Sequence, residues 1–104
     1  MEIDKLRNLI TKMINVIKPK GVSDIHFKLE PVYKDDSSFF MSITYVVPDD
    51  SQHLRMSNMR NSDNSRIEWN RQIKNTIENY FNTHIILTSS SIKSQSYNNK
   101  LKEY

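Results

Sequence analysis

The sequence predicts a small α+β domain. We expect a two-layer sandwich of order α-β-β-α-β, with a three-stranded, mostly antiparallel sheet and two helices on one face. Apolar residues recur at helical spacing in two segments, alternate in two others and form a short run at residues 85–87. A chain of 104 residues fits one domain and hardly two. We assign residues 1–93 to this domain and residues 94–104 to a polar, basic tail that is flexible unless a partner orders it.

The first helix is expected at residues 2–18. Its apolar residues are spaced three and four apart, which places them on one face of an amphipathic helix. Pro19 and Gly21 then end the helix, because neither residue favours its continuation. The apolar stripe consists of Ile3, Leu6, Ile10, Met13 and Ile17.

The second helix is expected at residues 65–82. Ser65 is suited to the N-cap, and Glu68 follows three residues later, which completes a capping box. The preceding polar stretch, residues 52–64, has no clear period and is predicted to be a long loop. The apolar stripe of this helix consists of Trp69, Ile73, Ile77 and Phe81.

Three strands are expected at residues 24–33, 38–47 and 84–92. The first two alternate between apolar and polar residues, and the polar turn 34–37 between them predicts an antiparallel hairpin. Pro31 either marks the first strand as an edge strand or ends its pairing there. The helix before the third strand allows a right-handed crossover from the second. In the alternative, the third strand pairs antiparallel with the first.

The second strand carries apolar residues on both faces. If one set faces the helices, Phe40 and Val46 face outward, with Ile86 of the third strand beside them. An exposed apolar patch of this kind marks a protein interface. The alternative is that these residues are isolated apolar side chains of an ordinary surface. To this predicted interface we add three residues of the polar stretch, Leu54, Met56 and Met59.

Positive charge gathers after the predicted hairpin. Residues 23–52 contain two basic and six acidic residues, whereas residues 53–75 contain five basic and two acidic ones. Arginine is suited to bidentate contacts with phosphate, so this segment is a candidate for nucleic-acid binding. The alternatives are a solvated loop and helix face, or a contact with protein. The five basic residues are Arg55, Arg60, Arg66, Arg71 and Lys74.

The sequence offers few signals of catalysis. It contains no cysteine and one glycine, which excludes disulfides, thiolate metal sites and glycine-rich phosphate loops. The histidines His26, His53 and His84 are far apart and belong to no metal-binding motif. We therefore expect surface histidines rather than a three-histidine metal site, no cofactor and no enzymatic activity.

These patterns favour a non-enzymatic structural or adaptor subunit of a larger protein assembly, whose partners are other protein subunits in a homo- or hetero-oligomer. The alternative is a small accessory protein that binds nucleic acid. The chain has no alanine and is rich in Ile, Asn and Lys, which suggests an AT-rich genome such as that of a phage or virus. Without a signal peptide or roughly 20 consecutive apolar residues, we expect an intracellular or virion location and no membrane partner.

Overall fold

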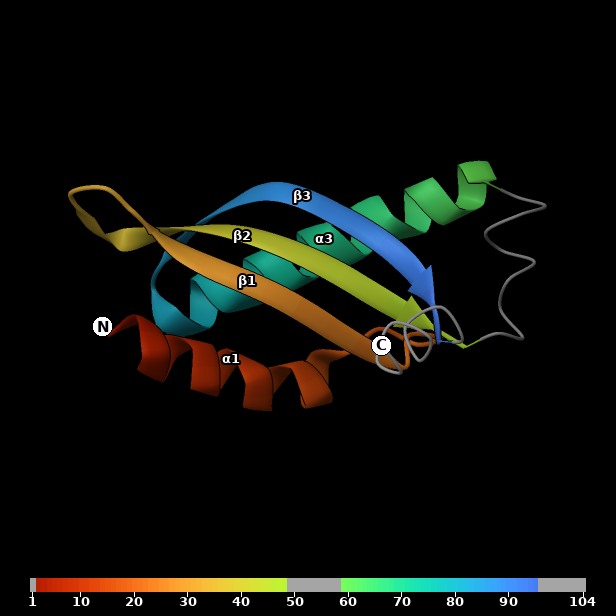
Figure 1. The fold of residues 1–104 in the computed structure, drawn as a ribbon, viewed down its shortest axis with the longest axis horizontal. Helices are drawn as coiled ribbons and strands as arrows, with labels where there is room; N and C mark the ends of the chain where they lie inside the picture. Colours follow the sequence, from red (N-terminus) through yellow and green to blue (C-terminus); the bar gives the residue numbers. More distant parts are fainter. Residues whose placement is uncertain (1, 49–58, 96–104) are drawn as a thin grey trace, which may run out of the picture.

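Two helices and three strands make up the part of the chain that the structure describes. The structure is a computed structural model and describes residues 2–48 and 59–95 (Figure 1). The elements are α1 (Ile3–Ile17), β1 (Asp24–Val32), β2 (Asp35–Val47), α3 (Met59–Phe81) and β3 (His84–Ser94). The predicted α+β class and the order α-β-β-α-β are confirmed.

The strand β2 lies at the centre of a sheet of order β1-β2-β3. It pairs antiparallel with β1 and parallel with β3. The sheet is therefore mixed, whereas the sequence analysis expected a mostly antiparallel one. A parallel neighbour requires a crossover connection, and α3 lies in that connection. The third strand does not pair with the first, because β2 separates them.

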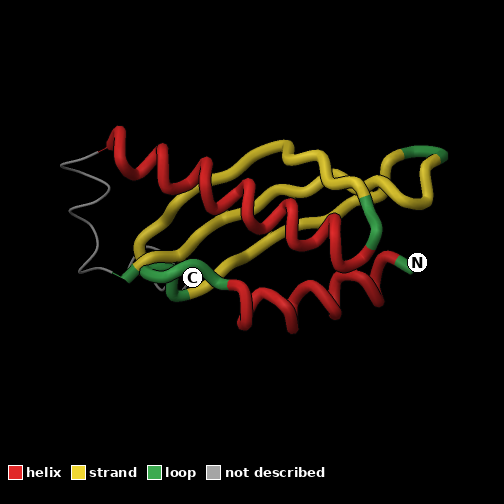
Figure 2. The backbone as a smooth tube through the Cα atoms, turned by 180° about the vertical axis from the view of Figure 1, so that it is seen from behind, coloured by secondary structure: helices red, strands yellow, loops and turns green. Residues whose placement is uncertain are grey.

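The helix α3 runs diagonally across one face of the sheet, and α1 runs along the β1 edge (Figures 1 and 2). That both helices cover one face stays a prediction, since α1 lies beside β1 rather than across the strands. Both helices nevertheless contribute to a single core with the sheet. Its buried residues are Leu6, Ile10, Ile14, Val22, Ile25, Leu29, Phe39, Met41, Ile43, Tyr45, Val47, Ile73, Ile77 and Ile85.

The β1–β2 hairpin turns through two residues, Tyr33 and Lys34, because Val32 already pairs with Asp35. Lys34, the second of these residues, adopts the left-handed conformation with φ of 62°. The Asp35 carboxylate accepts a hydrogen bond from the Ser37 N–H at 3.0 Å, which lowers the pKa of Asp35. The strand β2 thus begins at Asp35, three residues before its predicted start at residue 38.

The helix α3 begins at Met59, six residues before the predicted start. No proline or glycine between residues 59 and 65 stops a helix there. Ser65 therefore lies inside the helix, and the predicted capping box is wrong. Glu68 instead binds Arg71, whose guanidinium donates to both carboxylate oxygens at 2.6 and 2.7 Å. The rest of the predicted loop, residues 52–58, lies outside the described residues.

The strand β3 extends to Ser94, two residues beyond its predicted end. Ser94 is buried, so the first residue of the predicted tail belongs to the sheet. Residues 96–104 of that tail lie outside the described residues.

Truncation of the α1 stripe is expected to destabilise the fold. Leu6 and Ile10 are 0% exposed in the shared core, so Leu6→Ala or Ile10→Ala should lower the free energy of unfolding by about 2–5 kcal/mol. Val16 on the same helix is 84% exposed, and Val16→Ala should change it by less than about 0.5 kcal/mol. Urea unfolding followed by circular dichroism measures both. Equal losses at Val16 and Leu6 would contradict the assignment of the buried face.

Candidate functional site

The sheet face opposite α3, which we term the outer sheet face, has no described helix or strand across it (Figure 1). Side chains alternate between the faces of a strand, so residues between the core positions belong to this face. The three strands bring their outer residues into rows. From one end, these rows are Glu30–Phe40–Ile86, Lys28–Ser42–Ser89, His26–Thr44–Ser91 and Asp24–Val46–Lys93.

Phe40 and Ile86 lie side by side on the outer sheet face, because they are partners in the β2–β3 register. Their side chains are 37% and 36% exposed. A hollow of about 270 Å³ adjoins Phe40 and is lined also by Lys28, Glu30, Ser42 and Thr88. The structure thus brings together two of the three apolar residues that the sequence analysis predicted to face outward.

Val46, the third of these residues, does not contribute to an exposed patch. It lies in the outer row at the opposite end of β2, between Asp24 of β1 and Lys93 of β3. Only 2% of it is exposed, so the expectation of an exposed Val46 is wrong. The alternation of residues predicted its face correctly, but a side chain on a central strand is flanked by neighbours from both adjacent strands.

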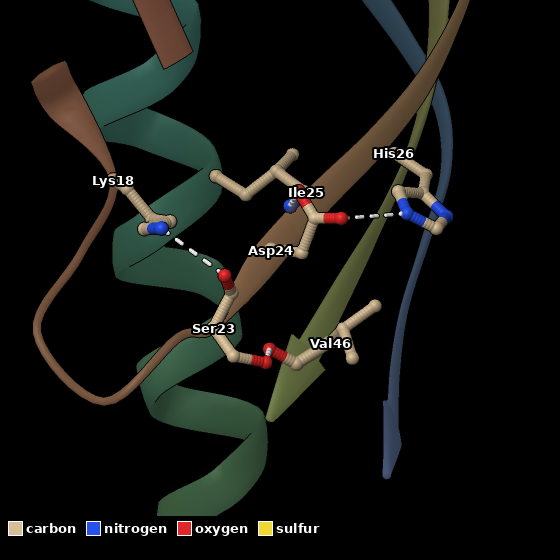
Figure 3. Close-up of polar contacts among 6 residues, drawn as sticks. All are labelled: Lys18, Ser23, Asp24, Ile25, His26 and Val46. Atoms are coloured by element: carbon tan, nitrogen blue, oxygen red, sulfur yellow. Dashed lines mark hydrogen bonds and ion pairs between the residues drawn. The ribbon is translucent and has the colours of Figure 1, made fainter. Parts of the chain in front are cut away.

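Hydrogen bonds fasten the segment between α1 and β1 to the end of β2 (Figure 3). The Ser23 N–H and hydroxyl both donate to the Val46 carbonyl, at 2.8 and 3.0 Å. The Lys18 ammonium in turn donates to the Ser23 carbonyl at 3.1 Å. This end of the outer sheet face is therefore held by the residue before β1, by the carbonyl of Val46 in β2 and by the residue that follows α1.

A carboxylate–imidazole pair lies beside this end of the face. His26 Nε2 is 3.0 Å from Asp24 Oδ2 (Figure 3), and the hydroxyls of Thr44 and Ser91 are 3.1 Å apart in the same row as His26. Nucleophilic catalysis needs the imidazole to contact a hydroxyl. Among the described residues no hydrogen bond joins His26 to either hydroxyl, and both members of the pair are about half exposed. The arrangement provides a surface ion pair when His26 is protonated.

The histidines do not converge on a metal site in the described part of the chain. His26 and His84 belong to the outer strands β1 and β3, and His84 Nδ1 lies 3.2 Å from its own carboxylate partner, Glu78. His53 lies outside the described residues. Residues 2–48 and 59–95 contain no group of three or more potential ligands that could hold a metal ion.

The predicted nucleic-acid-binding residues are only partly described. Arg66, Arg71 and Lys74 lie on α3, but at 100° per residue Arg66 and Arg71 point about 140° apart around the helix axis. The Arg71 guanidinium is engaged by Glu68. Arg60 also lies in α3, but its side chain lies outside the description. The same holds for Met59, which was predicted for the protein interface. The nucleic-acid candidate Arg55 lies outside the described residues. So do Leu54 and Met56, which were predicted for the protein interface.

A chain of side-chain hydrogen bonds that the sequence analysis missed joins β2, α3 and β3. The Tyr45 hydroxyl donates to Asn70 Oδ1 at 2.8 Å, and Asn70 Nδ2 donates to the Ser90 hydroxyl at 2.9 Å. Tyr45 is 0% exposed, and its burial raises the pKa of the phenol. The Trp69 ring packs against Tyr45 with 5.1 Å between the ring centroids. The network fixes β3 relative to the helix.

A second surface feature that the sequence analysis missed is an apolar groove of about 430 Å³ between the helices. It is lined by Leu9, Met13 and Val16 of α1 and by Tyr80 and Phe81 of α3, among others. Val16 and Tyr80 are 84% and 74% exposed. The signal in the sequence was the position of Val16 and Tyr80 at the margins of their apolar stripes.

Comparison with known proteins found no matching family, no matching curated protein and no matching solved structure. Within the described residues, neither helix combines the length and apolar character that crossing a membrane would require.

Removal of the Tyr45 hydroxyl is expected to weaken the link between β2 and α3. Tyr45→Phe leaves Asn70 Oδ1 without its donor, which should lower the free energy of unfolding by about 1 kcal/mol. Tyr80 is 74% exposed, so Tyr80→Phe should change it by less than about 0.5 kcal/mol. Urea denaturation of both variants measures the difference. A Tyr45→Phe variant as stable as the Tyr80→Phe variant would contradict the role of this hydrogen bond.

Tyr45 is also expected to make the fold sensitive to alkali. Its pKa is raised in the folded state above the value of about 10 in the unfolded chain. The contribution of the neutral phenol is therefore fully present below about pH 10 and is lost as the pH rises above that value. Between about pH 8 and about pH 11, the free energy of unfolding should fall less for Tyr45→Phe than for the wild type. Equal falls would show that another group causes the alkaline loss.

Proposed function

We propose that this chain is a non-enzymatic structural or adaptor subunit that binds another protein of a larger assembly through its outer sheet face. The observation that carries the proposal is the adjacent position of Phe40 and Ile86 on a face with no described element across it. Adjacent exposed apolar side chains on an open surface are typical of a protein interface.

The apolar contact is too small to hold a partner alone. Complete burial of a Phe or Ile side chain stabilises by about 1.5–3 kcal/mol. Phe40 and Ile86 are already about two-thirds buried, so each has about 0.5–1 kcal/mol left to contribute. A micromolar complex requires about 8 kcal/mol. The partner must therefore also use polar groups of the same surface.

The rows beside Phe40 and Ile86 supply such polar groups. Their centre carries four neutral hydroxyls, from Ser42, Thr44, Ser89 and Ser91. A hydroxyl both donates and accepts hydrogen bonds, and its burial costs far less than the burial of a charge. Most of the charged residues of this face lie on the outer strands, as in interfaces whose centre is depleted of charge.

The alternative function, binding of nucleic acid by the five basic residues, has weaker support. Of the three whose side chains are described, Arg71 already binds Glu68, and Arg66 and Arg71 point to different sides of α3. We expect no binding of single- or double-stranded oligonucleotides at micromolar protein in low salt, measured by fluorescence anisotropy. Binding that weakens steeply with salt and with Arg66→Glu or Lys74→Glu would favour this alternative.

The proposed function is tested by size-exclusion chromatography with light scattering on material from the native cells. The wild-type chain should elute in a complex heavier than its own 12.3 kDa. The double variant Phe40→Ser, Ile86→Ser should elute as a monomer. Val16→Ser, which changes an exposed apolar residue of α1, is the matched control and should stay in the complex.

Two results would contradict the proposal. A wild-type chain that elutes as a free monomer would show that no stable assembly forms. Loss of the complex in Val16→Ser, together with its retention in the double variant, would assign the interface to the groove between the helices.

A further inference from the structure

The strand β3 has an outer edge that pairs with no described strand. The Ile85 N–H points to this edge, because it donates to Glu78 Oε2 at 2.9 Å instead of to β2. Residues of one strand whose side chains share a face direct their N–H and C=O groups to the same side. Leu87, Ser90 and Ile92 share the core face with Ile85, since all four pair with core residues of β2. Their N–H and C=O groups therefore also point to the outer edge.

The opposite edge of the sheet is protected. Proteins usually block edge strands with proline, charged residues or a covering element, because unpaired edges bind other strands. On β1, the Arg7 guanidinium of α1 donates to the Leu29 carbonyl at 2.7 Å, and Pro31 has no N–H. On β3, one bulge at Thr88 interrupts the pairing, and the following residues 89–94 contain no proline and one charged residue, Lys93. Within the described residues, the β3 edge therefore lacks the protection that the β1 edge has.

The helix α3 extends beyond the β3 edge. In both views its N-terminal half lies outside the line of β3 (Figures 1 and 2). The hydrogen bond from Asn70 to Ser90 marks where the helix meets the strand. Ile67, one turn earlier, is 62% exposed. A strand added beside β3 would therefore lie over a helix surface that already carries an exposed apolar side chain.

The described side chains of α3 and β3 carry a net positive charge. Among the described side chains of α3 and β3, four are basic and two are acidic, if the histidine is counted as neutral. The acidic ones are Glu68, which forms an ion pair with Arg71, and Glu78, which lies beside His84 and accepts the Ile85 N–H. The basic ones are Arg66, Arg71, Lys74 and Lys93. An extended segment with acidic side chains complements this surface, whereas a second copy of β3 and α3 would bring like charges together.

We infer that the β3 edge accepts an extended, acidic segment of a partner protein as a fourth strand, next to Ile86 of the outer sheet face. Strand addition provides backbone hydrogen bonds from Leu87, Ser90 and Ile92. Alternate side chains of the added strand would contact α3 on one face of the sheet and extend the outer sheet face on the other. This inference rests on the proposed function and specifies the form of the partner. The backbone hydrogen bonds of the added strand would supply polar contacts that Phe40 and Ile86 lack.

The test uses the full chain and a fluorescein-labelled peptide of about ten residues in which Glu and Val alternate, followed by fluorescence anisotropy. The peptide should bind more tightly than its Lys-Val counterpart by about tenfold or more. A Glu-Val peptide that is N-methylated at every residue should lose binding, because it keeps its charge but donates no backbone hydrogen bond from either edge. No binding of the Glu-Val peptide up to millimolar concentration, or equal binding of the N-methylated peptide, would overturn the inference.

Two variants of Ser90 locate the contact on the protein. Ser90→Pro removes the N–H that points to the edge and should weaken binding about tenfold. Ser90→Ala removes the hydroxyl bonded to Asn70 but keeps the N–H, and should bind as the wild type. Equal binding by both variants would overturn the inference. Circular dichroism checks that Ser90→Pro folds. If this variant does not fold, the comparison of the N-methylated and unmethylated peptides on the wild-type chain tests the inference.

The two proposals fail in different ways. Phe40→Ser combined with Ile86→Ser tests whether the outer sheet face holds the native complex, whereas the N-methylated peptide tests whether the β3 edge pairs with a strand. A native complex that survives Ser90→Pro would leave the outer sheet face as the interface and overturn the edge contact alone. A dimer of the purified chain that Ser90→Pro dissociates would identify the added strand as a second copy and overturn the acidic partner.

Discussion

The pairing of β2 on both of its sides is the constraint on which the rest of the structure depends. β1 and β3 never pair with each other, so each is held in the sheet only through β2. One face of β2 supplies five buried residues to the core, and Tyr45 among them bonds through Asn70 to Ser90 of β3. This one strand therefore sets the register of both neighbours and the position of α3.

The surfaces left open follow from that arrangement. The helix α3 crosses the core face of the sheet, and α1 runs along the β1 edge. The outer sheet face and the β3 edge therefore have no described element over them. Ile86 lies at the junction of these two surfaces, because it pairs with Phe40 and belongs to the edge strand. A partner that adds a strand to β3 would thus gain backbone hydrogen bonds and an apolar contact in one place, which neither surface provides alone.

The sequence predicted those elements whose pattern is local and missed features that depend on pairing in three dimensions. The stripe of α1 and the alternation in β1 and β2 contain enough repeats to define a helix and a hairpin. The polar residues 59–64 have no such period, so the start of α3 was predicted too late. The sequence allowed a crossover from β2 to β3 but left pairing with β1 open, because the choice depends on which strands become neighbours. The Tyr45–Asn70–Ser90 network and the burial of Val46 depend on the same choice. The proximity of Phe40 and Ile86 was predicted from the faces of their strands and is fixed by the β2–β3 register.

The open edge of β3 is tested most directly by amide hydrogen exchange of the purified chain, measured residue by residue by NMR. The account predicts alternating protection along the strand: the amides of Ile86, Ser89 and Ser91, which point to β2, exchange slowly, and those of Leu87, Ser90 and Ile92, which point to the outer edge, exchange fast. Equal, strong protection of both sets in the free protein would show that the edge is already covered and would contradict its role as a binding surface.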